Sequence, residues 1–136
     1  MNMWRHVKYF KSADGIREYM KKHAAILRLK FEICQKVLEE NLADTGVAMW
    51  TKPKGGYFIS LNVYAGCAMK TVELAKEAGV VVTEAGATFP YHKDPGDTNI
   101  RIAPSFPKID ELEKGMEVLC ASVKLAAVQK LIEEKK

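Results

Sequence analysis

The sequence lacks long apolar runs and any strong excess of charge of one sign. No stretch approaches the roughly eighteen apolar residues of a membrane helix, and the first residues, MNMWRHVKYF, lack the apolar run of a signal peptide. The 21 basic and 17 acidic residues give a net charge of +4, and the positive charges are scattered. We therefore expect a cytoplasmic protein with neither a membrane nor a nucleic acid as partner.

Cysteine is also scarce, and its spacing matches no metal or redox motif. Cys34, Cys67 and Cys120 are an odd number without C-x-x-C spacing, and two of them fall on the apolar stripes of predicted helices. The three histidines lie far apart and show no ligand spacing. The sequence thus predicts buried thiols and no metal site.

The length and the 48% hydrophobic content predict one compact domain over residues 1–136. Apolar residues recur every three or four positions over residues 14–41, with Ser12 or Asp14 as the N-cap, which indicates one long amphipathic helix. At about 1.5 Å per residue it would extend roughly 40 Å. Such a helix is longer than the body of so small a domain, so it either projects or spans another part of the protein.

The remaining elements follow from periodicity and turn residues. The runs at 47–51 and 57–63 predict two strands joined by the hairpin loop KPKGG, and residues 80–83, VVVT, predict a short buried strand. Helices are expected over 69–78 and 109–133, with a long ordered loop at 84–98. The predicted fold is an α+β, two-layer domain whose small, mainly antiparallel sheet is covered on one face by long helices.

Arg101 stands in the middle of a predicted strand within NIRIAPSFP, residues 99–107. Alternation places Ile100 and Ile102 on one face and Arg101 on the other, the kind of face that also carries Phe58. Periodicity alone favours a solvent-facing arginine. The alternative is an anion site, because a guanidinium on a rigid strand can grip a carboxylate through two parallel hydrogen bonds. No nucleophile and base, carboxylate pair or Ser-His-Asp set can be specified, so no catalytic residue is predicted in this chain.

Five segments occur in a characteristic order: HAAILRLKFE, KPKGGYFISL, VELAKEAGVVVTEAGATF, NIRIAPSFP and IDELEKGMEVL. In this order they resemble the C-terminal small domain of fold-type I pyridoxal-phosphate enzymes, specifically the class I/II aminotransferases. The segment over residues 86–107 is most similar to a bacterial subgroup of aspartate aminotransferases and aminotransferase-like proteins. This resemblance covers residues 15–131.

The resemblance implies roles for two residues. The arginine matching Arg101 binds the α-carboxylate of the substrate, an amino acid or 2-oxo acid, and Phe58 matches an aromatic position on the substrate side of the cleft. It also implies that the long first helix runs between the small domain and a large one. The small domain then moves against the large domain when substrate binds.

The same resemblance implies what the chain does not contain. Pyridoxal 5'-phosphate needs a lysine, an acidic partner and a phosphate cup, and in this family all of them belong to the large domain. No cofactor-binding residue is therefore assigned here. We expect a fragment that is inactive alone, and a parent enzyme that is a cytoplasmic homodimer with an open choice of amino donor and 2-oxo acid.

Three positions depart from the family pattern: Leu29 replaces a proline, Lys108 replaces a serine or threonine cap, and His92 replaces a glycine. Two alternatives to an aminotransferase stay open. One is the small domain of another pyridoxal-phosphate protein, either a carbon-sulfur lyase or an aminotransferase-like transcription regulator. The other is a freestanding module that binds carboxylates or a protein.

Overall fold

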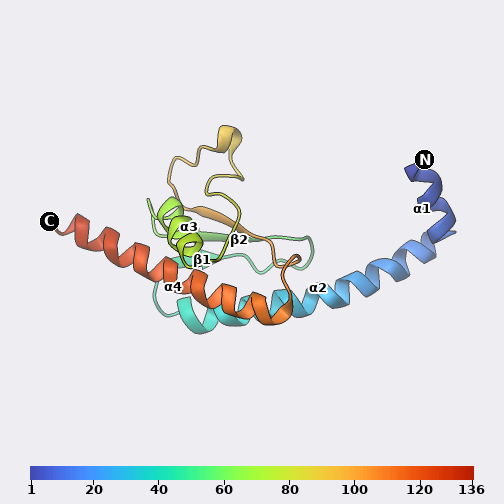
Figure 1. Ribbon diagram of the computed structural model, residues 1–136, viewed down its shortest axis with the longest axis horizontal. Helices are drawn as coiled ribbons and strands as arrows, with labels where there is room; N and C mark the ends of the chain where they lie inside the picture. The colour runs from blue at the N-terminus through green and yellow to red at the C-terminus, as the bar shows by residue number, and fades with distance from the viewer.

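The computed structural model describes residues 1–136 as four α-helices, three strands and a short 3-10 helix (Figure 1). The elements, in chain order, are α1 (Asn2–Phe10), α2 (Ala13–Leu42), β1 (Ala48–Trp50), β2 (Ile59–Val63), α3 (Ala68–Glu77), η1 (Pro90–His92), β3 (Asn99–Ile102) and α4 (Ile109–Glu134). This arrangement confirms the predicted α+β class. No helix combines the length and the apolar character needed to cross a membrane.

Helix α2 has the predicted extent and the predicted cap. The Ser12 side chain accepts a hydrogen bond from the backbone N–H of Gly15, which satisfies a donor that the first helical turn would leave free. Only the C-terminal part of the helix is buried, at Cys34, Val37, Leu38 and Leu42. The N-terminal part projects far beyond the body of the molecule and carries α1 at its end (Figure 1).

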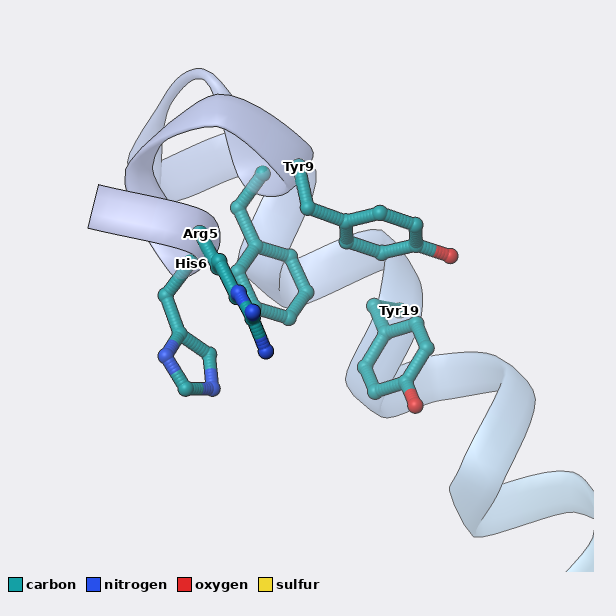
Figure 2. A pocket seen from close by; sticks show the side chains of 5 residues that line it. Arg5, His6, Tyr9 and Tyr19 are labelled. Carbon is teal, nitrogen blue, oxygen red and sulfur yellow. The ribbon is translucent and has the colours of Figure 1, made fainter. Parts of the chain in front are cut away.

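Helix α1 was not predicted, and it turns sharply into α2. Lys11 adopts φ of 60°, and any side chain at Gly15 would collide with the carbonyl oxygen of Phe10. The Phe10 and Tyr19 rings then meet edge to face, with centroids 5.2 Å apart. A hollow of about 350 Å³ lies at this junction, and Figure 2 shows Tyr9 and Tyr19 among the side chains that line it.

The sheet is antiparallel throughout, in the order β1-β2-β3. Strict alternation in β2 buries Ile59, Leu61 and Val63 and leaves Ser60 and Asn62 on the opposite face. The buried face joins α2, α3 and α4 in one hydrophobic cluster of 18 residues. Helices α2 and α4 lie side by side beneath the sheet (Figure 1), so one face is covered and the other stays open.

The strand predicted at residues 80–83 is wrong. Val80 and Val82 are half-buried against the core and Val81 is 81% exposed, so the side chains alternate as in a strand. The segment nevertheless pairs with none of the three strands. Alternation fixes which side chains are buried, but a strand also requires a neighbouring backbone with which to pair.

All three cysteines are free and buried, as predicted. Burial raises the pKa of the Cys34 thiol to about 12 and that of Cys120 to about 11. Thiolate is the reactive form of cysteine, so these two side chains are inert packing groups at neutral pH.

Helix α4 begins without a side-chain cap, because Lys108 occupies the N-cap position in extended conformation and its side chain accepts no hydrogen bond. We expect Lys108→Ser to raise the free energy of unfolding by about 1 kcal/mol, since a serine hydroxyl satisfies a free N–H of the first turn. Urea denaturation at neutral pH measures this change. Lys108→Ala, which also removes the charge but adds no cap, should give no comparable gain.

Candidate functional site

The open face of the sheet carries the two residues singled out from the sequence. The Arg101 guanidinium carbon lies 4.4 Å from the centroid of the Phe58 ring, which places the cation over the aromatic face. Phe58 is 46% exposed, whereas Arg101 is half-buried. The structure therefore brings the two predicted site residues into direct contact.

Arg101 has no acidic partner. None of the four ion pairs in the structure includes it, and its Nε atom is buried without a hydrogen-bond acceptor. A buried donor without an acceptor is costly in a folded protein, and the cost is larger for a charged group. The guanidinium is thus a charged fork with unused donors, which is the arrangement that an incoming carboxylate completes.

A polar network lies beside Arg101 on the same face. The Asn99 amide nitrogen donates hydrogen bonds of 2.8 Å to Ser60 Oγ and to Asn62 Oδ1. Its amide oxygen accepts a bond of 2.7 Å from the Thr88 hydroxyl. The amide is held from both ends, so this part of the face is rigid.

Asp94 organises the loop that leads into β3. Its carboxylate accepts hydrogen bonds from the backbone N–H groups of Gly96, Thr98 and Asn99 at 3.0, 2.8 and 2.8 Å. Partial burial of the carboxyl raises the pKa of Asp94, but these hydrogen bonds outweigh that effect and hold the pKa below its usual value. The charged form of Asp94 thus fixes the backbone two residues before Arg101.

The depressed pKa makes the loop sensitive to acid. A carboxyl whose pKa is lower in the folded than in the unfolded state stabilises the fold above the unfolded value, and the contribution disappears as pH falls through the folded value. We expect Asp94→Asn to lower stability at pH 7 and to remove part of the fall in stability that this carboxyl should cause below about pH 4. Urea midpoints measured from pH 7 down to pH 3 test this. An unchanged acid profile in the variant would contradict it.

A large groove lies away from Arg101. It has a volume of about 1160 Å³ and runs between α2 and the hairpin loop at 52–57, with Leu27, Phe31 and Tyr57 among its apolar residues. The loop is attached to the helix by Trp50, whose Nε1 donates to Gln35 Oε1 at 2.9 Å, and by the ion pair of Lys52 with Glu39. Arg101 does not line this groove.

The other candidate residues are separate from this site. His92 is exposed in the loop and adopts φ of 56°, a conformation that suits the glycine expected there. His23 is exposed on α2, where its ring packs against Tyr19 with centroids 4.5 Å apart. Neither histidine therefore contacts Arg101 or Phe58 in the structure.

Comparison with known proteins decides the family. The family model described as aspartate amino-transferase matches residues 1–135. The chain belongs to that family. It is 47% identical over 129 residues to an aspartate aminotransferase of Corynebacterium glutamicum, and it covers 30% of that protein.

Solved structures agree with this assignment. The crystal structure of an aspartate transaminase from Corynebacterium glutamicum superposes with a TM-score of 0.90 at 48% identity, over 92% of this chain and 30% of that one. An alpha-aminoadipate aminotransferase from Thermus thermophilus, complexed with N-(5'-phosphopyridoxyl)-L-leucine, has the same fold at 20% identity, with a TM-score of 0.73 over 85% of this chain and 29% of that one. The chain thus spans under a third of the length of these relatives.

The residues of this chain do not by themselves fit pyridoxal phosphate. The cofactor is held by a lysine in an enclosed site, yet no lysine in the chain is buried. Lys30, which is half-buried, already donates hydrogen bonds of 2.8 and 2.7 Å to the carbonyl oxygens of Ser105 and Pro107. The feature of the open face that stands out is instead the Arg101 guanidinium, which has no acidic partner and lies over the Phe58 ring.

Proposed function

We propose that this chain is the C-terminal domain of a pyridoxal-phosphate-dependent aminotransferase, in which Arg101 binds the α-carboxylate of the substrate. The observation that carries the proposal is the half-buried guanidinium that lies over Phe58, has no acidic partner and keeps a buried Nε–H free. Family membership supports the reaction class, namely transfer of an amino group from an amino acid to a 2-oxo acid.

One carboxylate clamp suffices for both half-reactions. The amino acid that gives up its nitrogen and the 2-oxo acid that receives it both carry an α-carboxylate, so the same two parallel hydrogen bonds from Arg101 can orient each substrate. Pyridoxal phosphate, when bound by the remainder of the enzyme, supplies the electron sink for this chemistry. The role of this chain is to bind the α-carboxylate of the substrate and to orient the substrate.

The position of Arg101 suits orientation. It lies on β3, whose backbone is paired with β2, and its side chain is flanked by the ring of Phe58. A clamp on a paired strand is held more tightly than one on a loop, and small displacements of a bound substrate are costly to the rate. Phe58 also offers an apolar surface beside the bound carboxylate.

The exposed apolar surface of the projecting helix is evidence that a second, larger unit packs against it. Half-exposed or exposed apolar side chains, among them Met20 and Ile26, line the part of α2 that leaves the body of the molecule. An exposed apolar surface of this kind marks a protein contact. In the proposed enzyme the large domain covers it, the two domains close over the substrate, and two copies form a homodimer.

A chimera tests the proposed function. Residues 1–136 replace the matching C-terminal part of the Corynebacterium glutamicum aspartate aminotransferase, and transamination is measured for a series of amino acids. We expect an active enzyme from the chimera and no activity from residues 1–136 alone. A chimera that folds and carries cofactor but transfers no amino group would contradict the proposal, as would activity of the isolated chain.

The same experiment separates the proposal from a freestanding carboxylate-binding module. Such a module would bind small carboxylates through Arg101 but would not restore transamination when joined to the cofactor-binding part of a relative. The match to the family model over residues 1–135 favours the enzyme.

A further inference from the structure

Ser60 lies directly opposite Arg101 on the open face of the sheet. The two residues are register partners on the antiparallel strands β2 and β3. The backbone groups of Ser60 point toward Thr51, at the end of β1, and not toward β3. The Ser60 carbonyl accepts a hydrogen bond of 3.0 Å from Thr51 N, and the Ser60 N–H donates to Thr51 Oγ1. Ser60 and Arg101 therefore form a pair without hydrogen bonds between their backbones, the kind in which side chains lie closest.

The hydroxyl group of Ser60 donates no hydrogen bond of its own. Asn99 Nδ2 donates to Ser60 Oγ at 2.8 Å, which occupies an acceptor position on the hydroxyl. The structure contains no bond in which the Ser60 hydroxyl is the donor. A serine hydroxyl has one proton to give, so Ser60 retains a free donor beside Arg101.

Asn99 fixes where that donor can point. Its amide is anchored on the far side by the Thr88 hydroxyl and by Asn62, at 2.7 and 2.8 Å. Because Asn99 approaches Ser60 Oγ as a donor, the proton of the hydroxyl is directed away from Asn99. The backbone of Asn99 is itself tied to the Asp94 carboxylate at 2.8 Å, so the arrangement rests on the ordered loop.

On this geometry, and resting on the proposed function, we infer that Ser60 is a second substrate-binding residue: its hydroxyl donates to the α-carboxylate that Arg101 binds. Asn99 is the positioning residue that aligns the hydroxyl. Two unused donors on register partners, one charged and one neutral, suit an anion with two oxygens.

The test measures carboxylate binding to the full chain of 136 residues directly. Acetate is titrated at constant ionic strength while NMR follows the Nε–H resonance of Arg101, and acetamide serves as the uncharged control. We expect Ser60→Ala to weaken acetate binding roughly 10- to 150-fold, as loss of one hydrogen bond to a charged group implies. Ser60→Thr keeps the hydroxyl and should stay within about twofold of the original affinity.

Asn62→Ala is the matched control, because it removes the other partner of the Asn99 amide and leaves the Ser60 hydroxyl in place. Its acetate affinity should also stay close to that of the unchanged chain. Unchanged affinity in Ser60→Ala, with binding lost in Arg101→Ala, would overturn the role of Ser60 and leave the proposed function intact. Absence of any acetate-dependent shift of the Arg101 signal would overturn both.

Discussion

Replacing Arg101 by alanine in the active chimera is expected to lower kcat/KM roughly 100- to 5,000-fold, which corresponds to a loss of about 3–5 kcal/mol in transition-state binding. The reason is that two parallel charge-assisted hydrogen bonds to the α-carboxylate disappear, and the carboxylate then lacks a counter-charge in the closed site. Arg101→Lys retains the charge without the planar fork of donors, so its kcat/KM should fall between that of the original chimera and that of Arg101→Ala.

Steady-state kinetics with the amino donor and the 2-oxo acid varied in turn measure this effect. Both substrates should be affected, since both carry the carboxylate. Lys114→Ala is the matched control for removal of one positive charge, because Lys114 is exposed on α4, the helix that covers the opposite face of the sheet. A loss in the Lys114 variant equal to that of Arg101→Ala would mean that net charge, not the clamp, controls activity.

Truncation of Leu38 to alanine is expected to lower the free energy of unfolding by about 2–5 kcal/mol, a large part of the stability of a small domain. Leu38 is fully buried on α2 and belongs to the cluster that α2 shares with the sheet and with α4. Its removal leaves a cavity where three elements meet. Urea denaturation of the chain, followed by circular dichroism, measures the change.

Leu29→Ala is the control for the stability experiment, because it is the same substitution on the same helix. Leu29 is 49% exposed and precedes the buried part of α2, which begins at Cys34, so its truncation should change stability by less than about 0.5 kcal/mol. Equal losses at the two positions would contradict the division of α2 into a buried C-terminal part and an exposed remainder.

Helical periodicity predicted α2 and α4 well because each has a continuous apolar stripe. The stripe over residues 14–41 anticipated Ala13–Leu42 to within one residue at each end, and Ser12 is the cap. Helix α1 was missed although Met3, Val7 and Phe10 recur at helical spacing. These three side chains contribute nothing to the buried core, so they form no stripe that is continuous with it.

The sheet shows the limit of alternation. Alternation identified β2 and β3 correctly and placed Arg101 on the open face, whereas the apolar run VVVT predicted a strand at 80–83 that pairs with nothing. Pairing joins segments that are distant along the chain. Alternation within one segment does not contain that information.

The same limit explains what was missed at the site. Alternation places Ser60 on the same face of its strand as Phe58, and Asn99 on the same face of its strand as Arg101. It does not place them beside one another, because that requires the register between β2 and β3. The contact of Arg101 with Phe58 and the hydrogen bonds of Asn99 are products of that register.

The central claim is that Arg101 recognises the α-carboxylate, and substrate discrimination tests it most directly. In the chimera, kcat/KM is measured for an L-amino acid and for its α-carboxamide, each with Arg101 and with Arg101→Ala. If the guanidinium binds the carboxylate, the original chimera prefers the acid strongly, and Arg101→Ala abolishes most of that preference while changing the rate with the amide little. An acid preference that survives the substitution undiminished would contradict the account.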